Sequence, residues 1–149
     1  MATLEVRPAR ILLVDDNATD VALTRTALRS AKLAVELHCV SSGEEALQFL
    51  RRQGRHAAAT APDLVLLDVR MPGISGIETL RIIKADPGLR ALPVVMLTSS
   101  TLDEDVLRSY TEHANAYMTK PIDIDSFRTV VQRLEDFWFS VVVLPHRDD

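Results

Sequence analysis

Five short apolar runs of strand length alternate along this chain with longer stretches whose apolar residues recur at helical spacing. This alternation limits the possible folds more than any other feature. The strand-length runs cover 11–14, 35–40 (rich in β-branched residues), 64–68, 93–98 and 116–119. The helical stretches cover 19–32, a segment that starts at 41–44 and has its apolar face at 46–50, 76–85, a segment from 102, and 123–136. Nearly continuous apolar strands between amphipathic helices are typical of a parallel sheet covered on both faces. The sequence therefore predicts an α/β fold with a doubly wound, five-stranded parallel sheet.

The size and composition of the chain indicate one soluble domain. Its 149 residues can bury a sizeable core without disulfides, and the lone cysteine, Cys39, is predicted to lie in that core. A formal net charge of −4 disfavours binding to nucleic acid or to an anionic membrane. No run reaches the ~18–20 apolar residues that span a bilayer. We expect a cytoplasmic protein with an N-terminal tail over 1–8, one domain over 9–136 and an apolar C-terminal extension over 137–149.

Chemically reactive side chains stand at the carboxyl ends of four of the predicted strands. They are Asp15 and Asp16 after the first, Asp68 at the end of the third, Thr98 at the end of the fourth and Lys120 after the fifth. Each residue alone has an ordinary explanation, such as a helix cap or a solvated charge. The carboxyl ends of parallel strands meet at one edge of the sheet, however, and ligands bind there in folds of this kind. We therefore expect these side chains to form one site.

Three clustered carboxylates repel one another unless a cation lies among them. Ligands that offer only oxygen, with no histidine or cysteine nearby, favour a hard ion such as Mg²⁺. Such an ion and a lysine would offset the charge of a phosphoryl group, and a carboxylate can act as the nucleophile to give an aspartyl phosphate. The residues therefore indicate phosphoryl chemistry. The four histidines (His38, His56, His113 and His146) are scattered without ligand spacing, and we assign them no metal or catalytic role.

Four motifs resemble the signature of the response-regulator receiver domains of two-component signalling systems. They are Val14-Asp15-Asp16-Asn17, Leu66-Leu67-Asp68-Val69-Arg70-Met71-Pro72-Gly73, Leu97-Thr98-Ser99 and Tyr117-Met118-Thr119-Lys120-Pro121. The resemblance extends over residues 9–136. It implies a flavodoxin-like sheet with strand order 2-1-3-4-5. It also implies a phosphoacceptor signalling protein, not an enzyme, that receives its phosphoryl group from a sensor histidine kinase.

The resemblance assigns the acceptor and metal roles residue by residue. Asp68 would be the phosphoacceptor. Asp16, Asp68 and the main-chain carbonyl of Arg70 would bind Mg²⁺ directly, and Asp15 would assist through water. Arg70 and Ser100 occupy positions that vary in the family and help to set the lifetime of the phosphoryl group, and our hypothesis is that Arg70 slows hydrolysis.

The resemblance also assigns the residues that respond to phosphorylation. Lys120 would pair with one phosphoryl oxygen, and Thr98 would donate a hydrogen bond to another after moving toward it. Tyr117 matches the aromatic residue that turns inward as the Thr98 hydroxyl moves. The peptide bond before Pro121 would be cis, as is usual in the family.

The C-terminal part carries a second resemblance. Segments 113–117 and 135–145 are similar to the single-domain regulators that partner cyanobacterial and bacterial phytochromes, which implies a phytochrome kinase as the partner. In those regulators such an extension supports a homodimer through the fourth helix, the fifth strand and the last helix. The residues expected at this interface are Phe137, Trp138, Phe139, Val142 and Leu144. The same apolar residues also allow the segment to fold back over its own core.

Several other classes of protein share parts of this residue pattern. A phosphorelay intermediate or phosphate sink for a non-phytochrome kinase is one alternative. A degenerate receiver that never takes phosphate is another, but every residue type that phosphorylation requires is present. A haloacid-dehalogenase-type phosphohydrolase would carry Asp-x-Asp after the first strand, whereas Asp15 and Asp16 are adjacent. A flavodoxin-like nucleotide-binding module would need a phosphate loop where these two carboxylates would repel a phosphate. We therefore favour a receiver whose output is contact with another protein.

Overall fold

The computed structural model describes residues 8–30, 35–99, 114 and 116–133. The predicted helix from 102, Ser100, His113 and the extension over 137–149 lie outside the described residues. The strands are β1 (Ala9–Val14), β2 (Val35–Val40), β3 (Leu64–Asp68), β4 (Val94–Thr98) and β5 (Ala116–Thr119). The helices are α1 (Ala18–Ser30), α2 (Gly43–Leu50), α3 (Gly76–Ala85) and α5 (Ile124–Arg133), with a short 3₁₀ turn, η1, at Gly54–His56.

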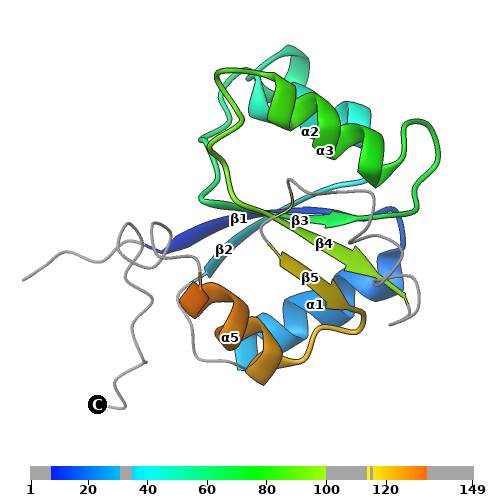
Figure 1. Cartoon of the computed structure of the whole chain (residues 1–149), viewed down its shortest axis with the longest axis vertical. Helices are drawn as coiled ribbons and strands as arrows, with labels where there is room; N and C mark the ends of the chain where they lie inside the picture. Colours follow the sequence, from blue (N-terminus) through cyan, green and yellow to red (C-terminus); the bar gives the residue numbers. More distant parts are fainter. Residues whose placement is uncertain (1–7, 31–34, 100–113, 115, 134–149) are drawn as a thin grey trace, which may run out of the picture.

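The five strands form one parallel sheet in the order β2-β1-β3-β4-β5, as predicted. Figure 1 shows α2 and α3 on one face of this sheet and α1 and α5 on the other. Every residue of β3 and of β4 is buried. Strands that are covered on both faces have no polar side, which explains why the sequence shows continuous apolar runs instead of alternation.

Successive side chains of β1 pack into two separate hydrophobic cores, one on each face of the sheet. Ile11 and Leu13 pack with Phe127 of α5 on the α1 and α5 face. Leu12 and Val14 pack on the opposite face against the cluster that contains Leu80 of α3. This period of two is the geometry of an extended strand, whose side chains point alternately to the two faces of its sheet.

Short polar side chains begin the helices. The side-chain oxygen of Asn17 accepts the backbone N–H of Asp20 at 2.9 Å at the start of α1. The hydroxyls of Ser42 and Ser75 accept N–H groups in the first turns of α2 and α3, each at 3.1 Å. These bonds satisfy backbone donors that have no partner inside the helix. The caps therefore fix where α1 and α3 begin relative to the strand ends that precede them.

One detail differs from the sequence-based expectations. Cys39 is exposed instead of lying in the core, and its Sγ accepts a hydrogen bond from Arg25 at 3.3 Å. The reason is that β2 lies at the edge of the sheet, so that part of its surface remains open to solvent. Among the described residues, no helix combines the length and apolar character needed to cross a membrane.

Candidate functional site

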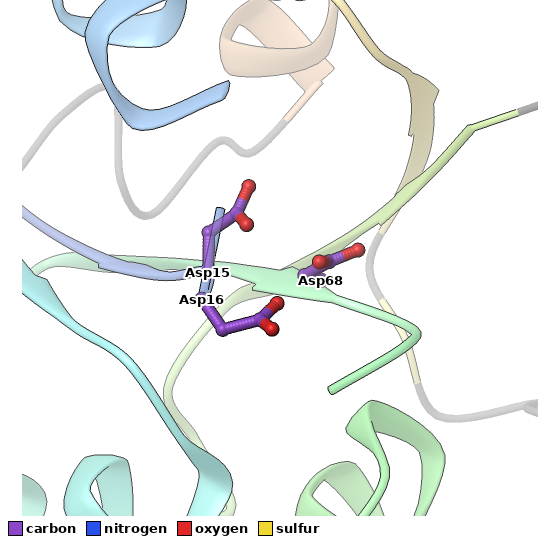
Figure 2. A group of neighbouring side chains, drawn as sticks. All are labelled: Asp15, Asp16 and Asp68. Atoms are coloured by element: carbon purple, nitrogen blue, oxygen red, sulfur yellow. The ribbon is translucent and has the colours of Figure 1, made fainter. Parts of the chain in front are cut away.

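The carboxyl ends of the central strands bring three carboxylates together. Asp15 and Asp16 follow β1, and Asp68 is the last residue of β3, the neighbouring strand. Each of the three offers a carboxylate oxygen, and these oxygens lie within 4.8 Å of one another. Figure 2 shows the three side chains gathered at this edge of the sheet. Asp15 and Asp68 are buried, whereas Asp16 is exposed.

Lys120 supplies the positive charge of the site. It follows β5, and its Nζ lies 3.3 Å from a carboxylate oxygen of Asp15 and 3.3 Å from one of Asp68. Its side chain is only 10% exposed. The parallel pairing of β4 with β5 brings this residue to the same edge, and the Lys120 backbone N–H donates to the Thr98 carbonyl at 2.7 Å.

Asp20 belongs to the same group, although the sequence analysis did not single it out. Its carboxylate accepts a hydrogen bond from Lys120 Nζ at 2.7 Å. Asp20 lies in the first turn of α1, directly after the β1 strand end. A helix that follows a strand begins at the edge where that strand ends. An acidic residue in that first turn was therefore the signal that could have pointed to this position.

The charges at the site change the pKa values of the buried groups. Burial raises the pKa of Asp68 from 3.8 to about 6, and the Asp15 carboxylate adds to this effect, while Lys120 and the Arg70 backbone N–H oppose it. Burial alone would lower the pKa of Lys120, but its bond to Asp20 and the charges of Asp68 and Asp15 outweigh this and raise the pKa above its ordinary value. Lys120 is therefore a permanent cation near neutral pH.

A pocket opens beside these groups. Its lining consists of Asp16, Asn17, Asp20, Asp68, Val69, Arg70, Thr98, Ser99 and Lys120. The cavity therefore brings together Arg70 and four residues that were predicted at the strand ends: Asp16, Asp68, Thr98 and Lys120. Asp15 is not part of this lining, and its side chain is 0% exposed. Among the described residues, Tyr117 does not belong to this lining. It is half-buried and packs against the core on the α2 and α3 face of the sheet.

The turn after β3 holds Asp68 tightly against α3. The Gly76 backbone N–H donates to the Val69 carbonyl at 2.9 Å. A Cβ atom at Gly76 would lie 2.0 Å from the Asp68 carbonyl oxygen, so only glycine fits this approach. Gly73 has φ +80, in the left-handed region, and the Lys120–Pro121 peptide bond is cis, as the resemblance implied.

The residues at this edge suit a divalent cation. All three clustered ligand groups are carboxylates, and hard cations prefer oxygen ligands. Two of these carboxylates are already drawn toward a positive charge, that of Lys120. The net charge of the group still favours a further cation, because Lys120 and Arg70 cannot balance the carboxylates of Asp15, Asp16, Asp20 and Asp68. Asp15, Asp16 and Asp68 therefore fit a metal site.

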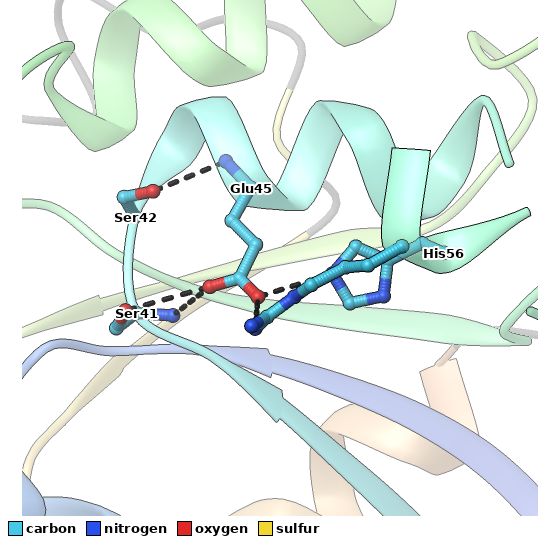
Figure 3. A network of polar contacts seen from close by, with 5 residues as sticks. Ser41, Ser42, Glu45 and His56 are labelled. Carbon is cyan, nitrogen blue, oxygen red and sulfur yellow. Dashed lines mark hydrogen bonds and ion pairs between the residues drawn. The ribbon is translucent and has the colours of Figure 1, made fainter. Parts of the chain in front are cut away.

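A second polar cluster lies apart from the pocket, between α2 and the η1 turn (Figure 3). The Glu45 carboxylate contacts His56 Nε2 at 3.0 Å and forms an ion pair with Arg55. It also accepts the backbone N–H of Ser41 at 3.2 Å. The ring of His56 stacks at a tilt on Phe49, with centroids 5.2 Å apart. These contacts join α2 to η1. The surroundings of His56 therefore indicate a structural role for this residue.

The fold and this site are those of a known family. The profile of the response regulator receiver domain matches residues 11–132 of the chain. The chain is 38% identical over 138 residues to the response regulator Rcp1 of Synechocystis, an alignment that covers 93% of this chain and 94% of Rcp1. The protein belongs to the response regulator receiver domain family, and the resemblance seen in the sequence is confirmed.

Within that family the protein is homologous to phytochrome-associated response regulators. The structure of the bacteriophytochrome response regulator AtBRR superimposes with a TM-score of 0.82 and 41% identity, over 89% of this chain and 96% of that one. The phosphorylated cyanobacterial phytochrome response regulator RcpA gives 0.70 and 37%, over 91% and 98%. The Mn²⁺-bound form of Rcp1 gives 0.70 and 38%, over 93% and 99%. The chain is thus a response regulator of two-component signalling.

Proposed function

We propose that this response regulator accepts a phosphoryl group on Asp68 from a phosphohistidine of a sensor kinase. The observation that carries this assignment is the position of Asp68, which ends β3 inside the pocket with Lys120 Nζ 3.3 Å from its carboxylate. A carboxylate oxygen of Asp68 attacks the phosphorus atom, the P–N bond of the phosphohistidine breaks, and its electron pair returns to the imidazole. Lys120 offsets the negative charge of the transferred group.

Mg²⁺ is the metal that we propose for the site. Asp16, Asp68 and the Arg70 carbonyl would hold it, and Asp15 would act through water. When bound, Mg²⁺ neutralises charge on the transferring phosphoryl group. The all-oxygen donor set supports this choice, because Mg²⁺ binds through carboxylates and keeps several waters. Lys120 and Thr98 would hold the phosphoryl oxygens afterwards, and both residues line the pocket.

The most direct test uses intact-protein mass spectrometry under native conditions with Mg²⁺, before and after incubation with acetyl phosphate. The expected result is one added phosphoryl group on the wild type and none on Asp68→Asn. Asp125→Asn is the matched control, because it makes the same acid-to-amide change at an exposed position on α5. An adduct that persists in Asp68→Asn would show that another residue is the acceptor.

We further propose that the kinase partner is a phytochrome and that the protein forms a homodimer. The similarity to the phytochrome response regulators supports the partner. The dimer would use the fourth helix, β5, α5 and the extension that contains Phe137, Trp138 and Phe139. Tyr117 on β5 would transmit phosphorylation at Asp68 to that surface. Phosphotransfer from a light-regulated bacteriophytochrome kinase tests the first point, and sedimentation with and without phosphorylation tests the second.

A further inference from the structure

The position of the Lys120 ammonium suggests a role for Asp20. Among the three carboxylates near Lys120 Nζ, Asp20 is the nearest at 2.7 Å, against 3.3 Å for both Asp15 and Asp68. Asp20 also lines the pocket. Its side chain is 29% exposed, compared with 8% for Asp68. The ammonium is therefore held nearest to the carboxylate at the rim of the pocket, on the α1 side.

This arrangement matters because an ammonium has three N–H donors and no more. Lys120 shares these donors among carboxylates on α1, after β1 and at the end of β3. A phosphoryl group on Asp68 needs one of the donors and the charge that comes with them. Asp20 competes for both. Its own negative charge, at the rim of the pocket, also opposes the approach of an anionic phosphoryl donor.

We propose that Asp20 is a positioning residue for phosphoryl transfer to Asp68: its carboxylate holds the Lys120 ammonium toward α1 and thereby slows phosphorylation by anionic donors. This inference rests on the proposed function, in which Asp68 is the acceptor. It makes the acceptance rate of the regulator depend on a residue outside the set that holds the metal and the phosphoryl group.

The alternative role for Asp20 is only to support α1. Acidic residues in the first turn of a helix interact favourably with the helix dipole, and Asp20 occupies such a position. The chain offers a matched control, since Glu78 stands in the first turn of α3 and does not line the pocket among the described residues. Glu78→Gln removes the same charge from an equivalent helix position without touching Lys120.

The experiment measures the second-order rate constant for phosphorylation of Asp68 in the full chain with Mg²⁺ at low salt. Two donors are compared: acetyl phosphate, a dianion at neutral pH, and phosphoramidate, which carries one negative charge less. We expect Asp20→Asn to react with acetyl phosphate about threefold to tenfold faster, as for the loss of one partly screened charge. The gain should be smaller with phosphoramidate and should shrink as salt is added. Asp20→Glu, which restores the charge, should lose most of the gain seen in Asp20→Asn, and Glu78→Gln should react near the wild-type rate.

Other outcomes would overturn the inference. An Asp20→Asn protein that is folded by circular dichroism but reacts at the wild-type rate or more slowly would do so. An equal gain with both donors, or in Glu78→Gln, would also refute it. If Asp20→Asn does not fold, Asp20→Ser provides the same comparison with a hydroxyl that can still serve the first turn of α1. A wild type in which Asp68 takes no phosphoryl group would instead refute the proposed function, and the inference with it.

Discussion

Replacing the acceptor candidate by its amide should stabilise the metal-free protein. In the folded chain Asp68 has a pKa of about 6 instead of 3.8, mainly because burial disfavours its charged form. The folded state therefore binds a proton more tightly than the unfolded state. The carboxylate consequently destabilises the fold once it ionises. One pKa unit corresponds to roughly 1.4 kcal/mol, so the cost at pH 7 is on the order of 2–3 kcal/mol. Asp68→Asn removes this cost.

The effect has a defined pH window. Stability of the wild type should fall, relative to Asp68→Asn, as the pH rises from about 4 to about 6, because across that range Asp68 is ionised in the unfolded chain but still largely protonated in the folded one. Below this window the two proteins should unfold at similar urea concentrations. Above it, Asp68→Asn should be more stable. The assay is urea unfolding followed by circular dichroism in EDTA at several pH values.

Adding Mg²⁺ provides the internal control for that experiment. A cation bound by the carboxylates should stabilise the wild type, because a ligand that binds only the folded state raises its stability. The amide variant lacks one of the proposed ligands and should gain less. A stability difference in EDTA that does not change with pH, or an Asp68→Asn protein less stable than wild type at pH 7, would refute the reasoning from burial.

Three further predictions concern neighbouring positions. Gly76→Ala should destabilise the fold by about 1–3 kcal/mol in urea unfolding, because the added Cβ would lie 2.0 Å from the Asp68 carbonyl oxygen. Gly88→Ala is the control and should reduce the stability much less, because its added Cβ has no contact closer than 3.4 Å. Arg70→Ala should shorten the lifetime of the phosphorylated protein, since Arg70 lines the pocket, and an unchanged rate of dephosphorylation followed by mass spectrometry would contradict this. Glu45→Gln should lower stability by about 1 kcal/mol through loss of its charged contacts. This loss should fade in acid, because the bond from the Ser41 backbone N–H and the contacts with His56 and Arg55 together outweigh burial and hold the Glu45 pKa below its ordinary value.

The sequence was sufficient to predict the architecture because two patterns were clear: the nearly continuous apolar runs of the strands and the helical spacing of apolar residues between them. Residues that alternate between two buried faces, such as Leu12 and Leu13, leave no polar side, and only a sheet covered by helices gives that pattern. The site residues could be grouped for the same reason. Once the strands are parallel, their carboxyl ends share an edge, so Asp15, Asp68 and Lys120 come together whatever the detailed packing.

The details that sequence reasoning missed depend on position within the sheet and on side-chain reach. Cys39 was expected in the core because it lies on a predicted strand. An edge strand such as β2 exposes part of its surface, however, and composition alone does not reveal which strand lies at the edge. In the sequence, Asp20 looks like an ordinary acidic residue in the first turn of a helix. Its contact with Lys120 depends on how α1 and β5 approach each other, which no local pattern records.

The separation of Lys120 from its partners along the chain has a consequence for the order of synthesis. Lys120 lies 105 residues after Asp15 and 100 residues after Asp20. A chain that has emerged only through β4 already contains all the carboxylates of the site and lacks the ammonium that offsets them. The last strand therefore completes the charge balance as well as the sheet. If the chain were divided between β4 and β5, the two fragments would form the complete site only when they associate. Phosphorylation of Asp68 could then report the association of the two fragments.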